Sequence, residues 1–245
     1  FEYYGINDGT DLASVRWSRR GYAVDDLSRL YTGNDARVDL VVAELAKRVV
    51  DVRAIRGLAF CVSVEHAEFM ARSLTARGVP AVAVHGKTDD EERASVRRRL
   101  ERREVNVVCT CDLYNEGVDL PFVDVLLLLR PTESVTLFLQ QLGRGLRLYE
   151  GKTSCLVLDF IGQHRAEFRF EPLYEALTGI PRARLRKAVE EGFPYLPSGS
   201  VLQLDPVVRE RVLESLKRAV ATGASLARDL RDLAASEPRI TLRRF

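Results

Sequence analysis

Residues 105–147 read VNVVCTCDLYNEGVDLPFVDVLLLLRPTESVTLFLQQLGRGLR, and this stretch decides the fold. It contains two short, almost wholly apolar runs, at 105–109 and 125–129, which indicate buried strands. A polar loop separates the two runs, and the apolar spacing after the second run predicts a helix over about 134–146. Strands that are apolar throughout and alternate with helices are typical of a parallel sheet that is covered on both faces.

The same alternation extends outward from this stretch in both directions. We expect strands at 58–62, 81–84 and 155–160, and helices from residue 35, at 65–77 and at 89–103. Gly78 follows the second of these helices, as expected of a helix end. The sequence therefore predicts an α/β domain over residues 35–165, built on a parallel sheet. Ligands of such sheets bind beyond the carboxyl ends of the strands.

The two flanks differ from this core. Residues 1–34 contain scattered glycines and aromatic residues, and we expect a connector or an edge element there. After residue 165 the pattern changes to amphipathic helices at 171–177, 182–191 and 206–220. We expect residues 166–245 to form a smaller, helical accessory region. The chain starts at Phe1 without a methionine, so we expect it to be a piece of a longer protein.

Composition excludes several classes of protein. The 245 residues carry a net charge of +2, which does not by itself indicate nucleic-acid binding. The four cysteines form no C-x-x-C pair, and the three histidines show no ligand spacing, so we expect no metal site. The longest apolar stretch, 123–129, is too short to cross a membrane. We expect a cytoplasmic protein with buried, reduced thiols and no membrane partner.

The sharpest local signal is QQLGRGLR at residues 140–147, a Q-x-x-G-R-x-x-R pattern. Arg144 and Arg147 are three residues apart, so on a helix or a helix end they point the same way. Arginine stays charged, and its fork of donors matches phosphate oxygens. The pattern therefore favours binding of a phosphate chain. The alternative is a basic helix end that makes only capping and surface contacts.

The second signal is the buried run that enters a polar loop and ends in Gly-x-Asp-x-Pro at residues 117–121. Gly117 would allow the backbone to approach a ligand closely, and the carboxylate of Asp119 could accept ribose hydroxyls. Taken alone, this segment is equally consistent with an ordinary strand-to-helix turn that has an acidic cap.

Together the two signals resemble motifs V and VI of the superfamily 2 helicases, which lie in the second RecA-like domain of those proteins. Residues 58–67 (LAFCVSVEHA) resemble motif IV, and residues 84–87 (VHGK) resemble the block that follows it. The order and spacing of all four blocks match over about residues 35–165. The chain looks most like the DEAD/DEAH-type bacterial helicases related to restriction-enzyme motors and excision-repair helicases. The resemblance implies a RecA-like fold.

The resemblance assigns roles near a nucleotide to six residues. It implies that Arg144 and Arg147 are arginine fingers, which reach the γ-phosphate of ATP bound on an upstream RecA-like domain of the same polypeptide. It implies that Gln140 lies near that phosphate and the attacking water. The remaining positions that it places near the nucleotide are Gly117, Asp119 and Gly143.

The resemblance also implies a set of contacts to the nucleic-acid backbone, made by Ser63, His85, Gly86, Thr110 and Cys111. One departure from the family pattern lies in this set. The usual motif V threonine falls on Cys111, whereas Thr110 is one residue earlier. Neighbours on a strand point to opposite faces, so Thr110 cannot simply replace the missing side chain. A backbone N–H contact could remain.

ATP and Mg²⁺ are the cofactors that the resemblance implies, both held mainly by the upstream domain. Residues 145–153 imitate a phosphate-binding loop, but five residues separate the glycines where the pattern needs four. A helix precedes this segment and a strand follows it, whereas a phosphate-binding loop needs the reverse. We therefore reject it as a nucleotide site and expect this chain alone to be inactive.

The resemblance thus implies the C-terminal motor half of an ATP-dependent helicase or translocase in the bacterial cytoplasm. It implies nucleic acid as the partner, with duplex DNA as the expected form, and admits a nuclease domain or subunit as a further partner. The alternative is a non-catalytic nucleic-acid-binding module with a helicase-like fold. A third reading, an unrelated doubly wound enzyme, would need a G-x-G-x-x-G turn, which the chain lacks.

Overall fold

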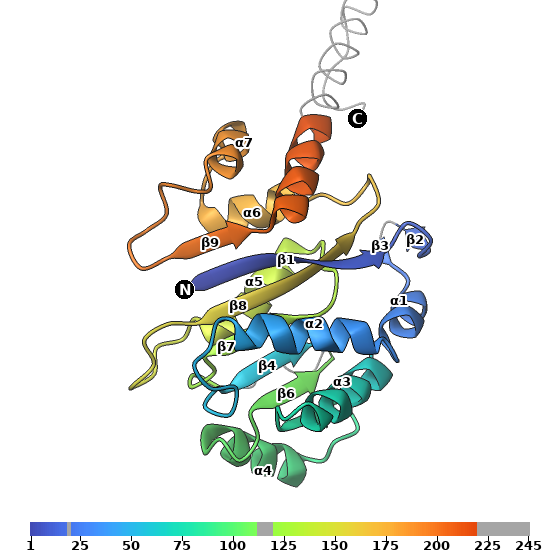
Figure 1. Ribbon diagram of the computed structural model, residues 1–245, viewed down its shortest axis with the longest axis vertical. Coiled ribbons are helices and arrows are strands. Elements are labelled where there is room, and N and C mark those ends of the chain that lie inside the picture. The colour runs from blue at the N-terminus through green and yellow to red at the C-terminus, as the bar shows by residue number, and fades with distance from the viewer. Residues whose placement is uncertain (19–20, 112–119, 220–245) are drawn as a thin grey trace, which may run out of the picture.

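The computed structural model describes residues 1–18, 21–111 and 120–219, which form one parallel sheet with helices on both faces (Figure 1). All neighbouring strands of this sheet run parallel. In their order across the sheet the strands are β5 (Ala81–Val84), β6 (Val107–Thr110), β4 (Gly57–Phe60), β7 (Val125–Leu128), β8 (Leu156–Gln163), β1 (Glu2–Asp11) and β9 (Val201–Leu204). A small antiparallel hairpin, β2 (Trp17–Ser18) and β3 (Gly21–Tyr22), follows β1.

The helices divide between the two faces because successive strand residues point to opposite sides. Ala59 of β4 packs with α2 (Asp35–Ala46) and α3 (Val64–Ala76). Leu58 and Phe60 belong to the core on the other face. The elements of that face are α4 (Asp90–Glu101), α5 (Val135–Gly145), α6 (Glu171–Thr178), α7 (Arg182–Glu190) and a helical segment at 206–219. Figure 1 shows α2 and α3 in front of the sheet and α5 behind it. The predicted fold class is confirmed.

The first 34 residues are more than a connector. β1 lies inside the sheet between β8 and β9, and α1 (Val24–Tyr31) packs on a small core beside Leu12. The strand is difficult to recognise in the sequence because Gly5 and Asn7 interrupt its apolar pattern. Gly5 lies so close to β9 that a Cβ there would come within 2.7 Å of Leu204 Cδ2. The close packing of β1 against β9 therefore requires glycine at position 5, and this glycine makes the strand difficult to recognise in the sequence.

The region after residue 165 is not purely helical either. β9 pairs with β1 from Glu2↔Val201 to Gly5↔Leu204, so the sheet continues into this region. Tyr174 of α6 and Leu185 of α7 belong to the same core as Tyr3 of β1. The described part of the region, 166–219, therefore extends the sheet and its core. β9 is difficult to recognise in the sequence because Val201 and Gln203 are exposed, so that only one face of the strand is buried.

A buried ion pair fixes β1 to the helix layer. Arg37 Nε of α2 donates to Asp8 Oδ2 of β1 at 2.8 Å, and both side chains are almost fully buried. A second guanidinium nitrogen of Arg37 donates to the carbonyl oxygen of Leu129 at 3.1 Å, and the guanidinium lies 4.1 Å from the ring centroid of Tyr31. One side chain therefore joins β1, α1, α2 and the residue after β7.

Candidate functional site

The two candidate arginines lie at the end of α5, at the edge of the sheet where the strands begin. α5 follows β7 and precedes β8, so it must run antiparallel to both strands. Ser134 caps its start, because its Oγ accepts the Leu137 N–H at 3.3 Å. Its end is pressed against the sheet: a Cβ on Gly145 would collide with Cys155 Sγ and lie 3.0 Å from Leu126. Glycine at this position lets the arginine-bearing helix end approach β7 closely.

The α5 residues differ in how far they reach the surface. Arg144 is 9% exposed, whereas Arg147 is exposed and lies two residues beyond the last helical residue. Gln140 is half-buried, while its neighbour Gln141 is 1% exposed. Gly143 has open space where a Cβ would lie. The structure therefore brings Gln140, Gly143, Arg144 and Arg147 together on one helix and its continuation.

The other two candidate nucleotide contacts, Gly117 and Asp119, fall outside the described residues. The last described residue before them is Cys111, which follows β6, and the first described residue after them is Leu120.

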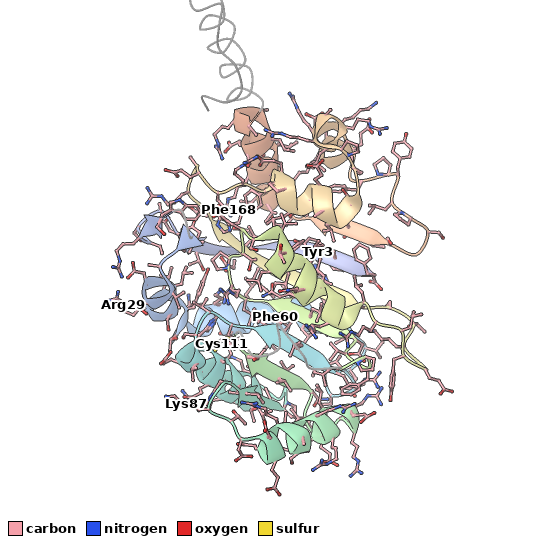
Figure 2. All side chains as sticks on the ribbon, turned by 180° about the vertical axis from the view of Figure 1, so that it is seen from behind. Tyr3, Arg29, Phe60, Lys87, Cys111 and Phe168 are labelled. Atoms are coloured by element: carbon pink, nitrogen blue, oxygen red, sulfur yellow. The ribbon has the colours of Figure 1, made fainter. Side chains whose placement is uncertain are left out.

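The candidate nucleic-acid residues lie at the opposite edge of the sheet. Ser63 follows β4, His85 and Gly86 follow β5, and Cys111 follows β6. These three strands are neighbours and run parallel, so their carboxyl ends share one edge. Figure 2 shows Cys111 and Lys87 at this edge. The structure therefore separates the predicted site residues into two groups.

Local hydrogen bonds hold the loops of this edge. Ser63 Oγ caps α3 by accepting the His66 N–H at 3.1 Å, and it lies 2.6 Å from Ser28 Oγ. The His85 N–H donates to Thr88 Oγ1 at 3.1 Å, and His85 Nδ1 accepts the Lys87 N–H at 3.3 Å. Gly86 and Lys87 are exposed. These loops present backbone groups and one ammonium to the solvent.

Thr110 and Cys111 differ in accessibility. The Thr110 side chain is fully buried, and its carbonyl accepts the Cys61 N–H at 2.7 Å. Cys111 is half-buried. In this conformation a ligand at this edge reaches Cys111 or the backbone before it reaches the Thr110 hydroxyl.

His66, near the start of α3, supports this edge from inside. The ring is fully buried, stacks on Tyr31 with 5.4 Å between centroids, and accepts the Val62 N–H at Nδ1 over 3.2 Å. Burial lowers the pKa of His66 to about 3, with the charge of Arg37 as a further cause. The ring is therefore neutral at physiological pH, and its role is to hold the residues that precede Ser63.

Asp159 lies in the middle of β8, under α5 and α6, where it accepts a hydrogen bond from the Tyr3 hydroxyl. It lines a cavity of about 20 Å³ together with Gln141 and Tyr174. Burial raises the pKa of Asp159 from 3.8 to about 7, and the negative charge of Asp8 contributes in the same direction. The hydrogen bond from Tyr3 and the charge of Arg37 oppose this shift.

We expect Asp159 to make the fold less stable as the pH rises from about 4 to about 7. The unfolded chain loses this proton near pH 3.8, whereas the folded chain keeps it until about pH 7. The folded state therefore binds more protons in this window, and stability falls as they are lost. Each pKa unit corresponds to about 1.4 kcal/mol, and partial solvent contact reduces the effect, so we expect about 1–3 kcal/mol.

The measurement is urea unfolding of wild type and Asp159→Asn at pH 5 and pH 8. Asparagine cannot ionise and can still accept from Tyr3, so the variant should gain stability relative to wild type at pH 8. Equal differences at the two pH values would contradict this assignment.

Two of the described residues are suited to the phosphate part of a nucleotide. Arg144 and Arg147 are cations suited to phosphate oxygens. Among residues 1–18, 21–111 and 120–219, no cluster of three or more His, Cys, Asp or Glu side chains could hold a metal ion. Within the same part of the chain, no helix is long and apolar enough to cross a membrane.

Comparison with known proteins supports the resemblance to helicase C-terminal domains. The family model described as the helicase conserved C-terminal domain matches residues 40–149. The Schizosaccharomyces pombe protein irc3, named for mitochondrial ATP-dependent helicase activity, is 31% identical over 173 residues, which cover 68% of this chain and 28% of that protein. The UvrABC system protein B of Thermosipho africanus is 35% identical over 121 residues, covering 47% of this chain and 18% of that protein.

Among solved structures, the yeast DEAD-box splicing factor Prp28 matches with a TM-score of 0.53 at 11% identity. The match covers 86% of this chain and 36% of the Prp28 chain, and it supports the RecA-like fold alone. The chain spans about a quarter of the length of the first curated relatives that it matches. The matched segment includes α3, the loop after β5 and the whole of α5. Residues 40–149 match the helicase conserved C-terminal domain, and the chain resembles the C-terminal motor half of superfamily 2 helicases.

Proposed function

We propose that this chain is the C-terminal motor half of an ATP-dependent helicase or translocase. Its Arg144 and Arg147 act on ATP bound to another RecA-like domain of the same polypeptide. The observation that carries the proposal is the position of the two arginines at the end of α5, within the segment matched by the helicase family model. The relatives named as ATP-dependent helicases support the same activity for the parent protein.

Different residues of the chain have different roles at the nucleotide. ATP supplies a polyphosphate whose terminal group carries negative charge in the transition state. Arg147, which is exposed, donates charge-assisted hydrogen bonds to those oxygens. Arg144 adds a second positive charge from its more buried position. Gln140 orients water near the terminal phosphate, and Gly143 leaves room for the nucleotide. Gly117 and Asp119 contact its ribose side.

The partner domain holds most of the nucleotide and the Mg²⁺ ion. The sequence of this chain contains no G-x-x-x-x-G-K-[ST] loop, whose amides and lysine hold phosphates in such motors. The proposal therefore assigns phosphate binding and the metal to the other domain, and charge stabilisation to this one.

Nucleic acid binds at the edge formed by the carboxyl ends of β4, β5 and β6. Ser63, His85, Gly86 and Cys111 face this edge, and backbone groups there suit contacts to phosphates, which carry no sequence information. Thr110 contributes through its backbone, because its side chain is buried. The resemblance to restriction-enzyme motors favours duplex DNA and a nuclease domain or subunit as partners, in the bacterial cytoplasm.

The test compares ATP hydrolysis by the 245-residue chain with hydrolysis by the parent protein, each with and without duplex DNA. The chain alone should show no turnover, and the parent protein should show turnover that DNA stimulates. Robust hydrolysis by the chain alone would contradict the division of labour. If DNA does not stimulate ATP turnover by the parent protein, a non-catalytic binding module is favoured instead.

A further inference from the structure

The segment after α5 is fastened by a lysine from the stretch that imitates a phosphate-binding loop. Lys152 Nζ donates to the carbonyl oxygens of Gly145 at 2.5 Å, Arg147 at 3.0 Å and Pro121 at 3.2 Å. An ammonium group has three N–H donors, and here each has a carbonyl acceptor. The first two acceptors belong to the arginine-bearing helix end, and the third belongs to the segment just after residues 112–119. One side chain thus joins the two segments.

The position of the ammonium suits the end of a helix. The last carbonyls of a helix have no partner within the helix, and a positive charge is favourable there. Lys152 is half-buried, and burial lowers its pKa. The group is therefore withdrawn from water, and its carbonyl contacts replace lost hydration.

Tyr149, three residues before Lys152, also joins the segment after α5 to the segment that begins at residue 120. The Tyr149 hydroxyl donates to Glu101 Oε1 of α4 at 3.0 Å. The Tyr149 ring packs edge-on against Phe122, with 5.9 Å between centroids, and the Arg56 guanidinium lies 5.5 Å from its centroid. The Lys152 N–H donates to the Tyr149 carbonyl at 3.1 Å. Tyr149 therefore fixes the turn that carries Lys152, while Lys152 reaches back to the carbonyl of Arg147.

We propose that Lys152 is a positioning residue for ATP hydrolysis, which holds the backbone of Arg147 and the end of α5 in a fixed place relative to Pro121. The proposal rests on the function proposed above. The structure supports it because Lys152 binds the carbonyl of Arg147 itself, whose side chain must reach a phosphate on another domain. A misplacement of about 1 Å in such a group can cost about 100-fold in rate.

The main experiment measures ATP turnover of the parent protein in the presence of duplex DNA for three variants, with Arg147→Ala as the reference for loss of an arginine finger. Lys152→Met removes the charge and donors at similar length, and Lys152→Arg keeps a charge and donors. Lys47→Met is the matched control, because Lys47 is the C-cap residue of α2, but its side chain is 65% exposed and pairs only with Glu44 within the described residues.

We expect Lys152→Met to lower kcat by roughly 10- to 100-fold, with the KM for ATP and the affinity for DNA changed by less than about 3-fold. Lys152→Arg should recover a large part of kcat, and Lys47→Met should match wild type. Hydrogen exchange of the 245-residue chain should show faster exchange in Lys152→Met confined to residues 146–153.

Three outcomes would overturn the proposal. If Lys152→Met keeps wild-type kcat while Arg147→Ala is inactive, the positioning role is rejected and the proposed function stands. Unchanged turnover in both variants would reject the proposed function, and the positioning role with it. Fast exchange over the whole sheet in Lys152→Met, with no recovery by Lys152→Arg, would show that Lys152 serves only the stability of the fold.

Discussion

Replacing Arg147 with alanine should lower the DNA-stimulated ATP turnover of the parent protein by about 10³- to 10⁵-fold, the range observed for loss of an arginine finger. Arg147 is exposed beyond the end of α5, while the Lys152 hydrogen bond to the Arg147 carbonyl holds its backbone. The variant should therefore fold normally and lose charge stabilisation at the phosphate. The measurement is steady-state ATP turnover, together with nucleotide binding at equilibrium.

The control is Arg186→Ala. Arg186 is also an exposed arginine, but it lies on α7, where it pairs with Glu190 at 2.9 Å. We expect this variant to keep wild-type turnover. The result expected for Arg147→Ala is lost turnover with retained nucleotide binding. If neither DNA nor the Arg147 substitution affects turnover, the chain is a binding module rather than half of a motor.

Replacing Asp8 with alanine should destabilise the fold by about 3–5 kcal/mol, because it leaves the charge of Arg37 buried without its partner. Arg37 and Asp8 have side-chain exposures of 2% and 0%, so water cannot replace the lost carboxylate. The change also removes the hydrogen bond from the Thr10 N–H to Asp8 Oδ1. Denaturant unfolding of the 245-residue chain, monitored by circular dichroism, measures the loss.

Two further variants separate the buried charge from loss of packing. The double variant Asp8→Ala with Arg37→Leu removes both charges, and we expect it to be more stable than Asp8→Ala alone. Arg16→Ala breaks an exposed ion pair with Asp26 and should change stability little. If the double variant is less stable than Asp8→Ala, the cost lies in the packing of Arg37 on Tyr31 rather than in its unpaired charge.

The central strands could be predicted from the sequence because burial on both faces makes them apolar throughout. β4, β6 and β7 are buried at every position, and the runs that mark them lie within two residues of the observed bounds. β1 and β9 could not be recognised in this way. β1 contains a glycine required by the approach of Leu204, and β9 exposes alternate residues. Pairing partners more than 150 residues away decide both strands, and local pattern does not reveal such partners.

The candidate site was only partly accessible to sequence reasoning. The resemblance to helicase motifs identifies Ser63, His85 and Cys111, and the structure brings these together at the carboxyl ends of parallel strands, where ligands of such sheets bind. The arginines of α5 lie at the other edge, where only the Q-x-x-G-R-x-x-R pattern identifies them. The sequence argues against Lys152 as part of a phosphate-binding loop, but its contacts to three carbonyls depend on a turn that no local motif encodes.

The place of β1 in the sheet has a consequence for the order in which the molecule can assemble. Glu2 pairs with Leu156 on one side and with Val201 on the other, so β1 leaves the ribosome before either of the strands with which it pairs. Such distant pairings carry a large loop-closure entropy and slow folding. We expect a nascent chain that stops near residue 150 to form the β4–β7 sheet with an unpaired β7 edge, which exposes it to aggregation until β8 and β1 close it.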